Sequence, residues 1–326
     1  CGSSMIPELS SLVGKVLTVT GPIDAADMGI TLPHEHLLTL HTPPEVVLSD
    51  PDLAAEELGL FFEAGGRTVV EVTSRGIRRD PAGLRAISEA SGVQIVMGSG
   101  HYKWRWHPED MDRRTTADIT REIIEDITVG ADGTGIRSGV IGEVGVSETL
   151  QYNEEKSLVA SAHAQLETGV ALNLHVHLID KVEEERLRTE VLDILQREGV
   201  DLSRVIVSHC EASPDAVDYH ERIIERDAYV EYDLFGMGAR ESSALPTYEQ
   251  EIAGIRDLIG RGYLDRILIS QDICYNDLLV ANGGWGYAHI LNDVVPRFRE
   301  FGVDDVAIRT MMVGNPARLF PITSPA

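Results

Sequence analysis

The sequence predicts a (β/α)8 barrel, also called a TIM barrel, in a single domain. Eight short apolar segments rich in β-branched residues recur along the 326-residue chain, and a charged segment with helical periodicity follows each of them. Strands that alternate with helices pair in parallel, and strands that are apolar almost throughout are buried on both faces. No Gly-x-Gly-x-x-Gly motif follows the first strand, which weakens the alternative of a doubly wound dinucleotide-binding sheet.

The strand assignments rest on runs such as TVVEVTS, RVIVSHC and RILISQD, which are rich in the residues that strands favour. In chain order, the expected strands cover residues 29–36, 68–74, 94–100, 139–145, 171–177, 204–210, 229–236 and 266–272.

The segments between these strands carry apolar residues at helical spacing. Asp80 before Pro81 is typical of a helix start, with aspartate as the N-cap and proline at the first position. Residues 15–28 are expected to form a short hairpin that closes the bottom of the barrel, and a last short helix is expected to begin at Asn315. The expected helices between strands cover residues 52–64, 81–91, 117–129, 154–168, 182–197, 216–226, 248–261 and 287–301.

The chain shows no linker, low-complexity tract or shift in composition, so residues 5–326 are expected to form one domain. The four residues before Met5 are expected to be a cloning remnant. The formal net charge of −25 argues against nucleic acid and against an anionic membrane surface as partners, since both repel an acidic protein. A small molecule is the expected partner, and a homodimer remains open.

The cysteine content indicates the compartment. Three cysteines, Cys1, Cys210 and Cys274, are too few for a disulfide framework, which favours a reducing, cytoplasmic setting. No run approaches the ~18 apolar residues of a membrane helix.

Histidines and carboxylates at the strand ends are the strongest functional signal. His34 and His36 end the first strand, and side chains two residues apart in a strand point to the same side. In a parallel barrel, the carboxyl ends of the strands build the active site. The predicted metal ligands are His34, His36, Glu143, His175, His209 and Asp272.

Four imidazoles and two carboxylates suit Zn²⁺, with Mn²⁺ or Co²⁺ as the alternatives. Two divalent ions about 3.5–4 Å apart would share one carboxylate as a bridge, and Glu143 on the fourth strand is the natural bridge between the two halves of the ligand set. The competing interpretations are a chance His-x-His doublet and a buried Glu143 paired with an arginine. A carboxylate in an apolar strand needs a counter-charge, and a pair of metal ions provides one.

With these residues assigned, the chain resembles the phosphotriesterase family of the amidohydrolase superfamily from Gly14 to Phe320. The segments GADGT at 130–134, IGEVG at 141–145, EYDLFG at 231–236 and GYAHIL at 286–291 are similar to those of phosphotriesterase-related proteins and phosphotriesterase-like lactonases. The resemblance implies a binuclear metal hydrolase on a (β/α)8 barrel. Many family members bridge their metals with a carboxylated lysine on strand four, whereas this chain has Glu143, so its bridge should need no CO₂.

The mechanism that the resemblance implies agrees with the chemistry of the residues. A hydroxide bridging the two metals would attack a lactone or related ester carbonyl, and Asp272 would take its proton and pass it to the leaving group. Weak phosphotriesterase activity is expected as a side reaction. The alternatives are an amidase acting on a small N-acyl compound and a non-catalytic metal-containing binding protein. Asp272 disfavours the binding protein, which needs no proton shuttle.

Loops at the expected active face suggest how a substrate is held. Cations in so acidic a chain can bind an anionic group on the substrate, although solvated loop charges are an equal alternative. His163 and His220, in helical segments, are expected at the surface or at an interface. The candidate substrate-binding residues are Arg75, Tyr102, Lys103, Trp104, His177, Asp233 and Arg240.

Overall fold

Eight parallel strands form a nearly closed barrel in the computed structural model, which describes residues 7–40, 47–176, 181–210, 217–237 and 245–325. Each strand pairs with its successor, and the first lies beside the last: the His36 N–H donates to the Ile273 carbonyl at 3.2 Å. The (β/α)8 prediction is confirmed. The strands are β3 (Ile30–Glu35), β4 (Gly66–Glu71), β5 (Gln94–Ser99), β6 (Val140–Val146), β7 (Ala171–Val176), β8 (Val205–Val207), β9 (Tyr229–Tyr232) and β10 (Ile267–Ile269).

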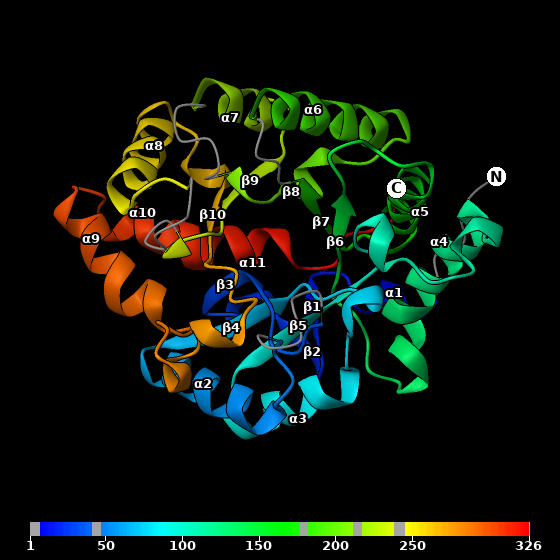
Figure 1. The fold of residues 1–326 in the computed structure, drawn as a ribbon, viewed down its shortest axis with the longest axis horizontal. Helices are drawn as coiled ribbons and strands as arrows, with labels where there is room; N and C mark the ends of the chain where they lie inside the picture. The colour runs from blue at the N-terminus through cyan, green and yellow to red at the C-terminus, as the bar shows by residue number, and fades with distance from the viewer. Residues whose placement is uncertain (1–6, 41–46, 177–180, 211–216, 238–244, 326) are drawn as a thin grey trace.

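Helices lie around the outside of the strands (Figure 1). Two expected helices contain π-helical turns, because α4 continues into Asp126–Gly130 and α9 is preceded by Ile290–Val294. The helices are α1 (Pro7–Ser10), α2 (Pro51–Glu63), α3 (Pro81–Ser91), α4 (Thr116–Glu125), α5 (Tyr152–Thr168), α6 (Lys181–Arg197), α7 (Val217–Ile224), α8 (Tyr248–Gly260), α9 (Val295–Glu300), α10 (Asp305–Arg309) and α11 (Asn315–Leu319).

Local capping explains where several of these helices begin. The Asp80 carboxylate accepts the Gly83 N–H at 3.0 Å and Pro81 occupies the first turn, as expected. Asp50 caps α2 in the same way, by accepting from Leu53 at 3.2 Å. Such caps satisfy amide groups that have no partner inside the helix, so each helix starts at a defined distance from the strand before it.

Apolar residues fill the bottom of the barrel. The predicted hairpin forms as β1 (Lys15–Thr18) and β2 (Gly21–Asp24), which pair antiparallel. Val16 from this hairpin and Phe320 after α11 pack against inward-facing strand residues. Those strand residues are Val70, Val72, Val96, Val140, Ala171, Ile206, Tyr229 and Leu268. Polar side chains are therefore left to the opposite, carboxyl end of the strands.

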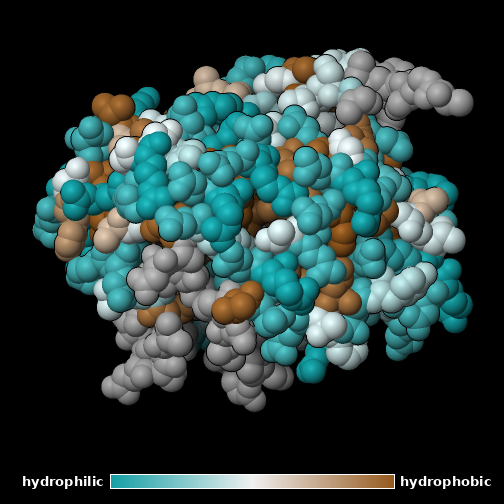
Figure 2. All heavy atoms as spheres, turned by 90° about the horizontal axis from the view of Figure 1, so that it is seen from above, coloured by the Kyte–Doolittle hydropathy of each residue, from teal (hydrophilic) through white to brown (hydrophobic). Residues whose placement is uncertain are grey.

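The face of the molecule in Figure 2 is mostly polar. Hydrophilic residues cover most of the face in Figure 2, and hydrophobic residues form small separate groups. None of the helices in the described ranges combines the length and apolar character of a membrane span.

The prediction that His220 lies at the surface or at an interface was wrong. Its side chain is fully buried on the inner face of α7, where the Nδ1 atom lies 2.8 Å from the Tyr232 hydroxyl. His163 is partly exposed, as expected, and its ring contacts Glu198 at 3.0 Å.

Candidate metal centre

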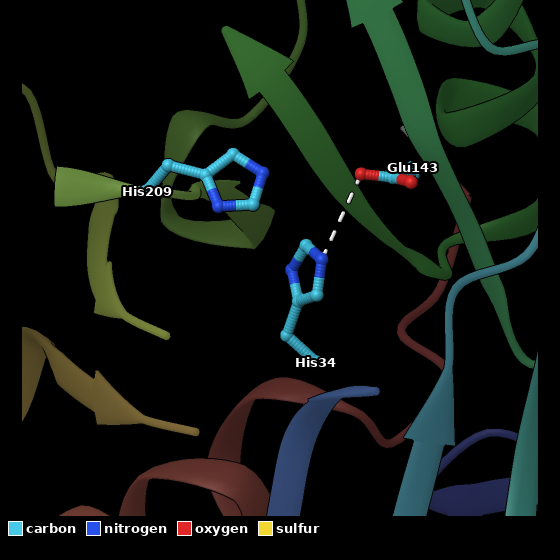
Figure 3. A group of neighbouring side chains, drawn as sticks. All are labelled: His34, Glu143 and His209. Carbon is cyan, nitrogen blue, oxygen red and sulfur yellow. Dashed lines mark ion pairs between the residues drawn. The ribbon is translucent and has the colours of Figure 1, made fainter. Parts of the chain in front are cut away.

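The barrel brings the six predicted metal ligands together at its carboxyl end. His34 lies in β3, Glu143 in β6 and His175 in β7, whereas His36, His209 and Asp272 follow the ends of β3, β8 and β10 by one, two and three residues. All six are buried, the most exposed at 8%. Figure 3 shows His34, Glu143 and His209 pointing toward one another, from β3, β6 and the segment after β8.

One half of the cluster contains His34, His36 and Asp272, whose ligand atoms lie within 4.8 Å of one another. The Asp272 Oδ1 atom is 3.3 Å from His36 Nε2 and 3.8 Å from His34 Nε2. The Oε1 atom of Glu143 approaches this half, at 3.4 Å from His36 Nε2.

The other oxygen of Glu143 faces the second half. Its Oε2 atom lies 2.7 Å from His175 Nδ1 and 3.7 Å from His34 Nε2. The His209 Nε2 atom is 2.8 Å from the same His175 nitrogen. The two oxygens of Glu143 therefore face different histidines, which is the orientation that a bridging carboxylate requires.

Two observations indicate that these residues fit a divalent ion. In the described part of the chain, His34 Nε2 and Asp272 Oδ1 are buried and have no hydrogen-bond partner. Buried polar atoms without partners are rare and call for an unseen ligand. A tetrahedral ion that binds nitrogen and oxygen at 2.0–2.1 Å separates its ligands by about 3.3 Å, close to the 3.3–3.8 Å between these nitrogens and Asp272.

Further carboxylates orient the imidazoles from behind. Glu231 Oε2 lies 3.0 Å from His34 Nδ1, and Asp233 Oδ1 lies 2.9 Å from His209 Nδ1. A carboxylate on the outer nitrogen of a histidine fixes the tautomer whose other nitrogen binds a metal. His36 is held similarly, because its Nδ1 contacts Thr73 Oγ1 at 2.8 Å and Thr73 donates to Glu71.

The backbone at two of the ligands is unusual. His209 has φ = 58° and Asp272 has φ = 48°, in the left-handed region that non-glycine residues seldom adopt. Glu35 holds the segment around Asp272 in place, because its carboxylate accepts the amide hydrogens of Gln271 at 3.2 Å and Ile273 at 2.8 Å. Strained backbone held by buried hydrogen bonds is typical of functional sites.

The electrostatics favour cations. Burial raises the pKa of the Glu143 carboxyl to about 7, although His36 and His34 oppose that shift. Burial lowers the pKa of His34, but Asp233, Glu231 and Asp272 outweigh it and raise the pKa well above its usual value. Burial would raise the pKa of Asp272, but its contact with His36 and the charge of His34 hold it below its usual range. Crowded buried carboxylates therefore stabilise positive charge at this site, as the raised pKa of His34 shows.

Sequence reasoning missed Glu231 and Glu35 as parts of the centre. A signal existed for Glu231, because it stands two residues before Asp233 in an otherwise apolar strand, the same spacing as His34 and His36. Glu35 carried no such signal, since it points to the opposite side of the strand from its two histidine neighbours.

Of the predicted substrate residues, Tyr102 contacts the candidate metal centre with its hydroxyl group. Its hydroxyl is 3.1 Å from His175 Nε2. Lys103 and Trp104 follow it, and Trp104 is 47% exposed. His177 and Arg240 lie outside the described residues.

Two other candidates are placed differently from the expectation. Asp233 is fully buried and accepts both the His209 amide and the ring Nδ1, so it positions a histidine instead of facing a substrate. Arg75 contacts three carboxylates, those of Glu122, Asp126 and Asp132, at 3.1–3.5 Å. Its charge is therefore already compensated within the protein.

Comparison with known proteins agrees with this geometry. The model of the phosphotriesterase family matches residues 14–320. N-acetyltaurine hydrolase from Dictyostelium discoideum is 36% identical over 280 residues, which cover 84% of this chain and 74% of that protein. A resiniferatoxin-binding protein from Rhodobacter sphaeroides has a TM-score of 0.88 at 37% identity, over 94% of this chain and 95% of that chain. A variant of a phosphotriesterase-like lactonase from Deinococcus radiodurans has a TM-score of 0.80 at 28% identity, over 94% of this chain and 99% of that chain. The chain therefore belongs to the phosphotriesterase family and is a hydrolase.

Proposed function

We propose that this protein is a binuclear metal-dependent hydrolase that cleaves the amide bond of a small N-acyl compound. The observation that carries the proposal is the unpartnered pair of buried atoms, His34 Nε2 and Asp272 Oδ1, in a cluster of six donor side chains. The donors proposed to hold the ions are His34, His36, Glu143, His175, His209 and Asp272. Imidazole and carboxylate donors suit zinc best, with manganese and cobalt as alternatives.

The two halves of the reaction are attack of water on the carbonyl and departure of the amine, and residues of this chain can be assigned to both. The metals, when bound, lower the pKa of water and polarise the scissile carbonyl. Asp272 is proposed to accept the proton of the attacking water and to return it to the departing amine with the carboxylate oxygen that does not bind a metal, since Oδ1 is the atom proposed as the metal donor. An amine leaves poorly without a proton, so amide cleavage depends on this transfer more than ester cleavage does. Glu231 and Asp233 hold His34 and His209 in position.

The choice of an N-acyl amide rests on the relatives. The N-acetyltaurine hydrolase of D. discoideum is a closer relative in sequence than the D. radiodurans lactonase. This ordering reverses the expectation from the sequence, which put a lactone or ester first. Lactone hydrolysis is the second candidate, because amide and lactone pass through the same tetrahedral addition at a carbonyl carbon.

The test is a set of substrates for metal-loaded protein: N-acetyltaurine, its neutral analogue N-propylacetamide, γ-butyrolactone and a phosphotriester. We expect kcat/KM to fall in the order anionic amide, lactone, phosphotriester, and to fall with each substrate in Glu143→Ala. Hydrolysis of lactones alone would favour the second candidate. No hydrolysis of any substrate by protein that holds two ions would favour the non-catalytic binding protein.

A further inference from the structure

Lys103 crosses the end of β6 close to the candidate metal centre. It follows β5 and precedes the short helical turn Trp104–Trp106. A Cβ atom on Gly145 would lie 2.4 Å from Lys103 N and 3.0 Å from Lys103 Cγ. Glycine at this position therefore allows the backbone and side-chain stem of Lys103 to pass directly over the strand, two residues beyond Glu143.

The ammonium group of Lys103 lies over the ring of Tyr102, and the Tyr102 hydroxyl contacts the candidate metal centre. The Lys103 Nζ atom lies 5.7 Å from the centroid of the Tyr102 ring, and the Tyr102 hydroxyl is 3.1 Å from His175 Nε2. Within the described ranges, Nζ takes part in no hydrogen bond or ion pair. Burial lowers the pKa of Lys103, against the nearby carboxylates of Glu143, Glu154 and Glu148. A cation that has lost hydration in this way binds an anion more strongly than a solvated one.

The carboxylate of Glu154 makes no direct ion pair with Lys103, and four neutral donors from the loops bind its two oxygens. Its Oε1 atom accepts from the Trp104 amide at 2.9 Å and the Ser147 hydroxyl at 2.6 Å. Its Oε2 atom accepts from the amides of Ser147 at 3.2 Å and Gln151 at 3.0 Å. Four donors on one carboxylate fix the loops after β5 and β6 against each other, so the position of Lys103 is set before any substrate arrives.

A hollow opens beside this lysine. A space of about 440 Å³ that is open to solvent lies between the two loops, and its lining residues are Lys103, Trp104, Arg105 and Trp106 from one loop and Ser147, Glu148, Thr149 and Gln151 from the other. Ligand sites commonly have volumes of about 300–1,000 Å³. The hollow therefore has room for the anionic end of a small substrate beside Lys103.

We infer that Lys103 is a specificity-determining residue that binds an anionic group, a sulfonate or carboxylate, on the amine side of the N-acyl substrate. The inference rests on the proposed function, because it places the scissile carbonyl at the metal centre. One tyrosine ring separates Nζ from His175, so we expect the anion to be joined to the amide nitrogen by an aliphatic linker that spans this ring. N-acyl derivatives of small amino-sulfonic and amino-carboxylic acids have this form.

The test compares charged and neutral amides in matched variants. Lys103→Met keeps most of the stem and removes the charge, and Lys103→Arg restores a cation. The control is Arg113→Met, since Arg113 is an exposed cation in the same connection between β5 and α4 that does not line the hollow. The substrates are N-acetyltaurine, N-acetyl-β-alanine and neutral N-propylacetamide, and the readout is the ratio of kcat/KM for each anionic amide to that for the neutral amide.

We expect Lys103→Met to lower this ratio by about tenfold to a hundredfold, chiefly through KM, because a charge-assisted hydrogen bond is lost. Lys103→Arg should recover most of the ratio, and Arg113→Met should change it less than twofold. A larger effect with the sulfonate than with the carboxylate, or the reverse, identifies the preferred anion. An unchanged ratio in Lys103→Met, or an equal change in Arg113→Met, overturns the inference.

The two proposals fail in different ways. Wild-type hydrolysis of N-propylacetamide supports the amidase proposal whatever Lys103 does. If the wild type cleaves only lactones, the amidase proposal fails, and Lys103 is then judged by N-acetyltaurine as an inhibitor of lactone hydrolysis. Inhibition at least tenfold weaker in Lys103→Met than in wild type supports the anion site, and equal or absent inhibition overturns it.

Discussion

Replacement of Glu231 by glutamine tests whether the carboxylates behind the histidines support metal binding. Glu231 is fully buried, and its Oε2 atom lies 3.0 Å from His34 Nδ1. The same oxygen accepts from the Ser208 hydroxyl at 2.7 Å and the Asn173 amide at 3.1 Å. Glutamine has nearly the same shape, so the substitution removes the charge and leaves the packing almost unchanged.

The expected loss follows from what the carboxylate does for His34. It keeps the proton on Nδ1, so that the lone pair of Nε2 faces Asp272 and Glu143, and it makes the imidazole a stronger donor to a metal. Loss of such a partner typically weakens metal binding by about 10- to 100-fold, which corresponds to about 1.4–2.7 kcal/mol. We expect Glu231→Gln to fall in this range, with turnover restored when excess metal is supplied.

Competition with a chelating dye measures the affinity, and the thermal unfolding midpoint of the metal-free protein shows whether the barrel is intact. The matched control is Glu57→Gln. Glu57 is another buried carboxylate, but it accepts from the backbone amides of Val280 at 3.0 Å and Ala281 at 2.8 Å. An affinity within twofold of wild type in Glu231→Gln would refute the reasoning, as would an equal loss of affinity in the Glu57→Gln control.

Four other outcomes are expected. Elemental analysis of active protein should find close to two divalent ions per chain, and His34→Ala or Glu143→Ala should lower both metal content and turnover; one ion or none in active protein would contradict the binuclear centre. Metal-free protein should regain full activity with metal alone in carbonate-depleted buffer, and a requirement for bicarbonate would mean that Glu143 is not the bridge. Asp272→Asn should lose about 10²–10⁴ in kcat with little change in KM for an activated ester, after turnover is normalised to metal content; a loss below tenfold would remove its proton-transfer role. Burial lowers the pKa of His220 to about 3 from 6.5, so the unfolded chain binds one more proton between these values and stability falls as pH falls. His220→Gln should remove about 1.4 kcal/mol per pH unit of that slope between pH 6 and 4, and urea unfolding at several pH values with an unchanged slope would contradict it.

The strand predictions were right in place and type, and most of their errors lie at the carboxyl ends. The sixth strand was expected at 204–210, but β8 ends at Val207. The eighth was expected at 266–272, but β10 ends at Ile269. In both, the chain leaves the ladder before the candidate ligand, because His209 and Asp272 adopt left-handed backbone that cannot continue a strand. Apolar runs do not reveal this turn.

The candidate metal donors could be proposed from the sequence because each is tied to a local pattern. His34 and His36 alternate along one strand, and the barrel places every strand end at the same face. Their distances from Glu143 and Asp272 follow from barrel closure, which the repeat of strand and helix already implies. That part of the site needed no knowledge of individual contacts.

Tertiary structure decided which polar residues serve one another. Arg75 resembled a free cation in a loop until Glu122, Asp126 and Asp132 were seen around it. Lys103 and Arg75 have the same charge and similar positions in their loops, yet in the described ranges only Arg75 is paired with carboxylates. The periodicity of apolar residues in the sequence predicts only the side of its own strand or helix to which a side chain points. Pairing, burial and desolvation depend on segments that come from elsewhere in the chain, and these three determine whether a charge stabilises the fold or remains available to a substrate.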